Sequence, residues 1–172
     1  MKTLILGGAR SGKSKLAEQY ASESQLSVCY IATSEPTDKE MSERVRLHRE
    51  RRPDHWGLVE EPIKLADVLK AQATSETCIL VDCLTLWLTN LLMLEDQSQF
   101  ESERQALLDV FPTLPGQIIM VSNETNMGVV PMGELTRKFC DEAGLLHQAV
   151  AEISEQVILT VAGLPHFLKG HA

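Results

Sequence analysis

The stretch Gly7-Gly8-Ala9-Arg10-Ser11-Gly12-Lys13-Ser14 decides how the rest of this 172-residue chain is interpreted. It follows a short apolar run at residues 3–6 and precedes residues 15–21, which are good helix formers with apolar side chains on one face. This is the pattern G-x-x-x-x-G-K-[ST] between a strand and a helix, the context that a phosphate-binding loop requires. Glycines allow backbone N–H groups to surround phosphate oxygens, and the helix N-terminus adds partial positive charge. We therefore expect the loop to bind a nucleoside triphosphate.

Two side chains of the loop have distinct expected roles. Lys13 should reach the β- and γ-phosphates as a catalytic residue, and the hydroxyl of Ser14 should be a ligand of Mg²⁺. The alternative is a chance glycine-rich turn between a strand and a helix. That alternative does not explain the Lys-Ser pair or the correct flanking segments.

The composition is that of one soluble globular domain spanning residues 1–172. Hydrophobic residues make up 44% and charged residues 23% of the chain, and the formal net charge is −8. An acidic chain is not expected to bind nucleic acid generally, since such proteins present a basic face. The cysteines Cys29, Cys78, Cys83 and Cys140 form no C-x-x-C pair, which favours reduced thiols in the cytoplasm over a zinc site. No apolar run approaches 18 residues, so no membrane span is expected. The N-terminus leads directly into an expected strand, so no signal peptide is expected either.

Strand-like and helix-like segments alternate along the whole chain. This alternation predicts an α/β fold of the P-loop NTPase (RecA-like) type, with a mostly parallel sheet and helices on both faces. We expect the chain's last strand to stop at Gly163. The expected strands are residues 3–6, 27–31, 56–59, 78–82, 117–121 and 157–161, and the expected helices are residues 15–21, 37–51, 63–73, 84–94, 101–110 and 134–153.

Polar residues gather where the expected strands end. In open parallel sheets ligands bind beyond the carboxyl ends of the strands, so these residues should converge on one edge of the sheet. Asp82 follows an apolar strand, as expected of a carboxylate that organises Mg²⁺ in such NTPases, although an Asp opening a turn is the alternative. The other strand-end residues of this kind are Thr33-Ser34, Glu60-Glu61 and Asn123-Glu124.

The expected helix at residues 37–51 has unusual chemistry for an acidic chain, because arginines surround a single histidine, His48. Neighbouring guanidinium groups should lower the pKa of the imidazole and favour its neutral, nucleophilic form. The same arginines could bind a triphosphate through paired hydrogen bonds. The alternative is a solvated basic face with a packed histidine. The arginines are Arg44, Arg46, Arg49, Arg51 and Arg52.

The sequence lacks motifs that are typical of two other classes of nucleotide-binding protein. Asp82 is followed by Cys-Leu-Thr rather than the D-x-x-G switch, and no N-K-x-D motif occurs, which argues against a Ras-like GTPase. No G-x-G-x-x-G motif occurs either, which argues against a dinucleotide oxidoreductase.

Nearly the whole chain resembles the bifunctional adenosylcobinamide kinase / adenosylcobinamide-phosphate guanylyltransferase family of cobalamin biosynthesis. The resemblance is carried by several segments together, which are far more specific than the phosphate loop alone. They are Gly7 to Ser14, Tyr30-Ile31-Ala32-Thr33-Ser34, Arg44-Val45-Arg46-Leu47-His48 with Arg52-Pro53-Asp54-His55-Trp56, Leu88-Thr89-Asn90-Leu91-Leu92, and Val121-Ser122-Asn123-Glu124 with Met127-Gly128-Val129-Val130-Pro131.

The resemblance implies two activities. The first moves the γ-phosphoryl group of ATP or GTP to the aminopropanol hydroxyl of adenosylcobinamide, and the second moves GMP from GTP to the resulting phosphate. In the family GMP is carried on a histidine that matches His48 here. The family is also similar in forming a homotrimer. For the base of the kinase step, Glu60 and Asp82 are the candidates.

The resemblance also implies a set of nucleotide and metal contacts. The expected metal ligands are Ser14, Glu60 and Asp82. The expected nucleotide contacts are Gly7, Gly8, Ala9, Arg10, Ser11, Gly12, Lys13, Ser14, Ala32, Thr33, Ser34, Arg49, Glu50, Arg51, Arg52, Glu60 and Asp82.

Two other functions stay open at this point. A simple P-loop kinase for a small molecule would keep the loop but give His48 no role. A nucleotide-gated binding protein would bind nucleotide without transferring any group to a corrinoid.

Overall fold

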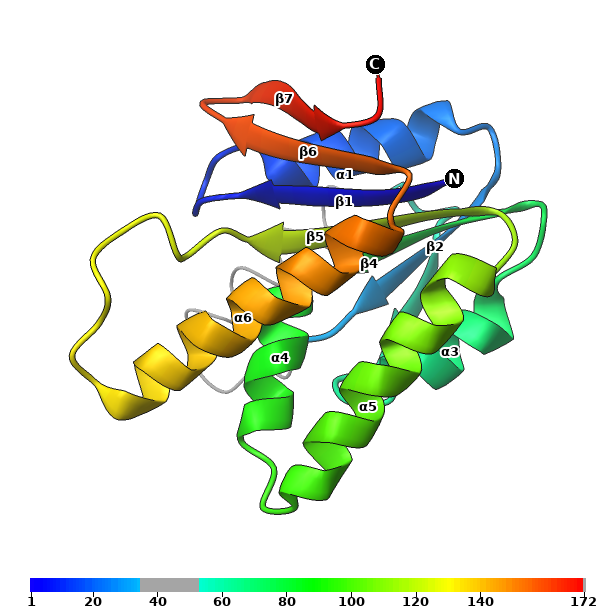
Figure 1. The fold of residues 1–172 in the computed structure, drawn as a ribbon. Coiled ribbons are helices and arrows are strands. Elements are labelled where there is room, and N and C mark those ends of the chain that lie inside the picture. Colours follow the sequence, from blue (N-terminus) through cyan, green and yellow to red (C-terminus); the bar gives the residue numbers. More distant parts are fainter. Residues whose placement is uncertain (35–52, 172) are drawn as a thin grey trace.

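A computed structural model describes residues 1–34 and 53–171 of the chain. Within these residues the fold is built on a seven-stranded sheet of order β3-β2-β4-β5-β1-β6-β7 (Figure 1). The first six strands in chain order run parallel, and β7 is antiparallel to β6. The strands are β1 (Lys2–Gly7), β2 (Ser27–Ala32), β3 (Gly57–Glu60), β4 (Thr77–Asp82), β5 (Gln117–Asn123), β6 (Gln156–Val161) and β7 (Leu164–Lys169).

Helices cover both faces of the sheet (Figure 1). One face packs against α1 (Lys13–Glu23), where the small, fully buried Ala17 and Ala21 let the helix lie close over Ile5 and Ile119. The other helices of residues 1–34 and 53–171 lie on the opposite face. They are α3 (Leu65–Gln72), α4 (Leu84–Leu92), α5 (Gln97–Val110) and α6 (Glu134–Ile153), with a short 3₁₀ turn, η1 (Phe111–Thr113), after α5.

The helix α4 shows how the sequence pattern leads to this packing. Leu84, Trp87, Leu88 and Leu91 have the spacing of one helical stripe, and all four are buried to within 1%. The indole nitrogen of Trp87 donates a hydrogen bond to the carbonyl of Ile63 at 2.8 Å, so its polar atom is satisfied in the core. The α/β fold expected from the sequence is confirmed, and the expected helix at residues 37–51 lies outside the described residues.

The expected end of the sheet at Gly163 is wrong, since the antiparallel strand β7 follows. Ala162 and Gly163 have φ angles of 52° and 80°, and Val161 pairs directly with Leu164. Two positive φ angles in a two-residue loop define the hairpin turn that matches strand twist. The Ala-Gly pair lacks the usual Asn-Gly or Asp-Gly signal, and Pro165 suits only an edge strand such as β7.

None of the helices in residues 1–34 and 53–171 is long and apolar enough to cross a membrane.

Candidate active site

The phosphate loop connects β1 to α1 and has a defined shape. Arg10 and Gly12 have φ angles of 57° and 96°, and the backbone nitrogen of Ser11 donates to the carbonyl of Gly8 at 3.2 Å. The first helical hydrogen bond runs from Leu16 to Gly12 at 3.0 Å. The N–H groups in the first turn of α1 therefore have no acceptor in the helix and can point to an anion.

Close packing against β6 explains two of the loop glycines. A Cβ atom on Gly7 would lie 2.7 Å from the carbonyl oxygen of Thr160. A Cβ atom on Gly12 would lie 3.1 Å from the Cα of Gly163, whose backbone nitrogen donates to the carbonyl of Ser11 at 2.8 Å. The hairpin that the sequence did not predict thus supports the loop from one side.

The loop side chains are arranged around an anion site. The ammonium group of Lys13 donates to the carbonyl of Gly8 at 3.2 Å, so it lies across the loop. The hydroxyl of Ser11 is buried and makes no hydrogen bond among the described residues. Both groups are donors that a phosphate oxygen could accept from.

Asp82 ends β4 and is oriented by a neighbouring strand. The phenolic hydroxyl of Tyr30 donates to its Oδ2 atom at 3.1 Å. Asp82 pairs in register with Ala32 of β2 and Val121 of β5, and β5 separates it from the loop strand β1. Side chains alternate along a strand, so Asp82 shares the α1 face with Leu80. Its strand is two strand steps from the loop strand β1.

Thr33 has a structural role at the end of β2. Its hydroxyl donates to the carbonyl of Cys83 at 2.7 Å and accepts from the nitrogen of Cys83 at 3.0 Å. The Asn90 amide donates to the carbonyl of Thr33 at 2.8 Å, and Thr33 is fully buried. Its hydroxyl is thus occupied, and the half-exposed Ser34 is the better placed hydroxyl for a nucleotide.

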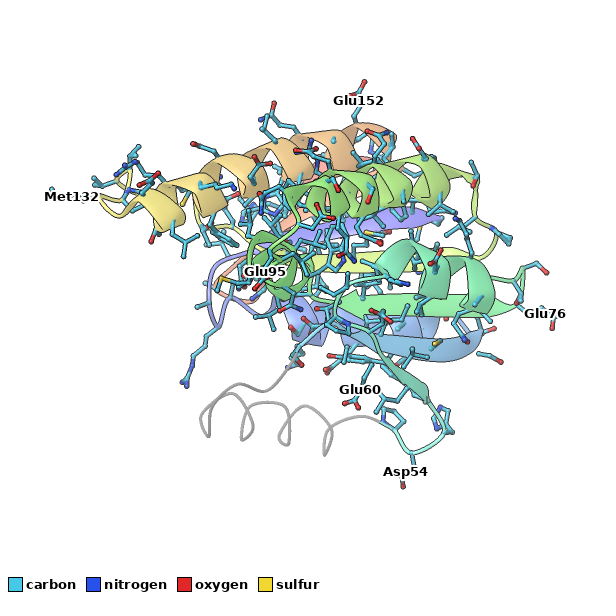
Figure 2. The ribbon with its side chains drawn as sticks, turned by 90° about the horizontal axis from the view of Figure 1, so that it is seen from below. Asp54, Glu60, Glu76, Glu95, Met132 and Glu152 are labelled. Carbon is cyan, nitrogen blue, oxygen red and sulfur yellow. The ribbon has the colours of Figure 1, made fainter. Side chains whose placement is uncertain are left out.

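Glu60 is distant from the phosphate loop. It pairs in register with Ala32 at the end of β3, the edge strand, and Figure 2 shows it on the side of the molecule opposite to α6. Four strand steps separate β3 from β1, or about 19 Å at about 4.8 Å per step. Ligands of one Mg²⁺ each lie about 2.1 Å from the ion. This spacing argues against Glu60 and Ser14 binding the same ion, and leaves Glu60 as an expected nucleotide contact.

Some of the expected site cannot be placed. His48, Arg49, Glu50, Arg51 and Arg52 lie outside the described residues, so their expected contacts stay predictions.

Two residues that contact the strand-end side chains of the site were given no role from the sequence. Tyr30 orients Asp82, and His147 of α6 is buried behind the end of β5, with its Nε2 atom 2.8 Å from the hydroxyl of Ser122. A tyrosine in a buried strand and a histidine on the inner face of an amphipathic helix both read as ordinary core residues. Only the strand order and the helix docking bring them to the site.

The phosphate loop is followed by a helix, and Asp82 ends a strand that one other strand separates from the loop strand. This arrangement defines a P-loop NTPase domain of the RecA-like type. A family model described as Cobinamide kinase / cobinamide phosphate guanyltransferase matches residues 3–168. The chain belongs to this family. The resemblance, the enzyme class and the pair of activities expected from the sequence are thereby confirmed, and a kinase without guanylyl transfer is not favoured.

Curated relatives match over almost their full length. The bifunctional adenosylcobalamin biosynthesis protein CobP of Pseudomonas aeruginosa is 59% identical over 170 residues, covering 99% of this chain and 98% of the relative. The bifunctional adenosylcobalamin biosynthesis protein CobU of Escherichia coli is 36% identical over 177 residues, covering 95% of this chain and 97% of the relative.

Solved structures support the fold alone. An ATPase from the type III secretion system of pathogenic bacteria aligns with a TM-score of 0.54 at 13% identity, over 96% of this chain and 56% of that chain. A Pyrococcus horikoshii protein aligns with a TM-score of 0.52 at 10% identity, over 99% of this chain and 87% of that chain.

Proposed function

We propose that this chain, as one domain, uses a single nucleotide site for both reactions of its family. It phosphorylates adenosylcobinamide with ATP or GTP, and then transfers GMP from GTP to adenosylcobinamide phosphate through a guanylylated His48. The observation that carries the proposal is the phosphate loop in a chain whose family model extends over residues 3–168. One triphosphate site can serve both reactions, because both begin with a nucleophile that attacks a phosphorus atom of a bound nucleoside triphosphate.

The proposed guanylyl transfer has two steps. A ring nitrogen of His48 attacks the α-phosphorus of GTP, and the bond to the bridging oxygen breaks and releases pyrophosphate. An oxygen of the corrinoid phosphate then attacks the phosphorus of the phosphoramidate, the P–N bond breaks, and His48 leaves with that electron pair as GMP passes to the corrinoid. Lys13 and the arginines near His48 offset the negative charge that grows on the leaving group.

The residues of the loop and of β4 fit Mg²⁺ as a cofactor. A hydroxyl and a carboxylate are the hard oxygen ligands that this ion prefers, and the hydrogen bond from Tyr30 orients the carboxylate of Asp82. We assign Ser14 and Asp82 to the ion. When bound, the ion would neutralise charge on the phosphate oxygens.

We also propose that the enzyme acts in the cytoplasm as a homotrimer. The four cysteines are all free, and three of them are buried in the core, which suits a reducing compartment. The trimer is proposed from membership of the family.

The test of the covalent step is incubation with GTP labelled with ³²P at the α-phosphorus, followed by denaturation. Label should stay on the protein, be lost in acid and survive alkali, as expected of a phosphoramidate. His48→Ala should abolish it, whereas His55→Ala, at a nearby exposed histidine, should retain it. A wild-type protein that retains no label while it still phosphorylates cobinamide would refute guanylyl transfer and favour the simple kinase.

A further inference from the structure

Polar side chains from three elements form a chain of hydrogen bonds behind the phosphate loop. The hydroxyl of Thr85 in α4 lies 3.2 Å from the hydroxyl of Ser122 at the end of β5. The Ser122 hydroxyl lies 2.8 Å from Nε2 of His147 in α6. Ser122 is 1% exposed and His147 is 7% exposed, so these two members of the chain are buried, whereas Thr85 is partly exposed. Buried polar groups of this kind are costly unless they have partners.

One arrangement of the protons in this chain places the ring proton of His147 on the nitrogen that faces Glu124. The hydroxyl oxygen of Thr85 accepts from the backbone nitrogen of Asn123 at 2.7 Å, so its own proton is available for Ser122. Ser122 then donates to Nε2 of His147, and the proton of the neutral ring lies on Nδ1. Burial lowers the pKa of His147 and keeps the ring neutral, against the opposing effect of Glu124.

The proton on Nδ1 of His147 faces a carboxylate. Nδ1 is buried, makes no hydrogen bond among the described residues, and lies 3.9 Å from Oε2 of Glu124. A carboxylate only accepts hydrogen bonds, so the Nδ1–H tautomer is the one that suits this neighbour. A contraction of less than 1 Å would bring the two atoms within hydrogen-bond range.

Glu124 is fixed at the mouth of the phosphate loop. Its backbone nitrogen donates to the carbonyl of Gly7, the first loop residue, at 3.0 Å. Its Oε1 atom accepts from the backbone nitrogen of Asn126 at 2.6 Å. The side chain is 16% exposed, so a substrate at the carboxyl ends of the strands can reach it.

We propose that Glu124 is the general base of the kinase step and that His147 and Ser122 position its carboxylate. The proposal rests on the proposed function. The carboxylate takes the proton of the corrinoid hydroxyl while the hydroxyl oxygen bonds to the γ-phosphorus. The bond from the γ-phosphorus to the β,γ-bridging oxygen breaks, and the nucleoside diphosphate leaves with that electron pair.

The two earlier candidates for this base suit it less well. Asp82 is assigned to the metal, and its Oδ2 atom already accepts a hydrogen bond from Tyr30. Glu60 is on the edge strand, four strand steps from β1. Glu124 is not assigned to the metal and, unlike Glu60, it lies beside the phosphate loop.

The guanylyl transfer reaction of the same enzyme is an internal control for loss of the general base of the kinase step. Removing a proton from a hydroxyl is needed for phosphoryl transfer to cobinamide, whereas cobinamide phosphate already carries an ionised nucleophile. Glu124→Gln should therefore lower the kinase kcat by at least about 100-fold, the usual effect of a general base, with KM for cobinamide changed less than about threefold. Labelling by α-³²P-GTP and transfer of GMP to preformed cobinamide phosphate should stay within about threefold of wild type.

Two further variants test whether a carboxylate is needed at position 124 and whether the effect is specific to that position. Glu124→Asp, which retains a carboxylate, should keep more kinase activity than Glu124→Gln. Glu152→Gln, at an exposed position of α6 that points away from the sheet (Figure 2), should match wild type in both reactions. A kinase rate within threefold of wild type in Glu124→Gln, equal losses in both reactions, or equal kinase losses in the Gln and Asp variants would overturn the proposal.

The positioning role has a separate readout. His147→Gln should lower the kinase kcat by about 10-fold and leave labelling intact. Combined with Glu124→Gln it should cause no further loss, because the histidine acts only through the carboxylate. Additive losses would show that His147 acts on stability instead. If the wild-type protein does not phosphorylate cobinamide at all, the proposed function is refuted. This outcome differs from every outcome given for the Glu124 and His147 variants, which compare variant with wild-type rates.

Discussion

Tyr30→Phe tests whether Asp82 is a ligand of Mg²⁺. The change removes one hydroxyl and keeps the ring, which is 4% exposed in the core against α1. Among the described contacts, the change removes the 3.1 Å hydrogen bond to Oδ2 of Asp82. Hydrogen bonds to charged groups contribute about 1.5–3 kcal/mol, and losing a partner of a metal ligand typically weakens metal affinity by 10–100-fold. This bond is partly buried and, at 3.1 Å, long for a hydrogen bond between two oxygen atoms. We therefore expect the affinity for Mg²⁺ to fall by about 10-fold, at the lower end of that span.

The assay is a titration of kinase rate with Mg²⁺ at saturating nucleotide. The midpoint for Mg²⁺ should rise about 10-fold in Tyr30→Phe, while kcat at saturating Mg²⁺ should fall less than about threefold. The matched control is Tyr20→Phe, at the other tyrosine of the chain, which is partly exposed, and it should leave the midpoint for Mg²⁺ unchanged. An unchanged midpoint in Tyr30→Phe would refute the assignment of Asp82 to the metal.

Three further outcomes follow from the packing and charge of the site. Gly7→Ala should lower the free energy of unfolding by about 1–3 kcal/mol in urea melts, because its Cβ would lie 2.7 Å from a backbone oxygen of β6; Gly8→Ala, with no atom within 4 Å, should not. Burial raises the pKa of the Cys83 thiol to about 11, so mass spectrometry after brief iodoacetamide treatment at pH 8 should find Cys140 alkylated and Cys83 spared. Burial lowers the pKa of His147, so the unfolded chain binds its proton first as pH falls through about 6.5, and stability should decline below that pH. In His147→Gln this part of the decline should be absent from thermal melts at pH 7.5 and 5.5.

The parts of the fold that the sequence predicted are those set by local pattern. The phosphate loop is contiguous, and its glycines are required by contacts within a few ångströms. Strands buried on both faces read as continuous apolar runs, so β4 and β5 were expected within two residues of their ends. The helix α6 was expected at the bounds that the structure gives, and it continues through Gly144 because its apolar stripe docks on the sheet.

The parts that the sequence missed depend on which elements are neighbours. The contact of Tyr30 with Asp82 joins residues 52 apart and requires β2 beside β4. The contact of His147 with Ser122 requires α6 to pack over β5. Nothing in a single local pattern specifies strand order or helix docking, so neither residue could be assigned a role from the sequence.

The missed hairpin also changes how the phosphate loop should be understood. Two strand ends hold it from opposite sides: Glu124, after β5, donates to the carbonyl of Gly7, and Gly163, after β6, donates to the carbonyl of Ser11. Both bonds are made within the chain, and a loop held in shape by its own neighbours loses less binding energy to ordering. The residue that holds one side of the loop is also the proposed base of the kinase step. A shift of β5 would therefore move the base and the phosphate site together, which keeps their relative geometry constant through both reactions.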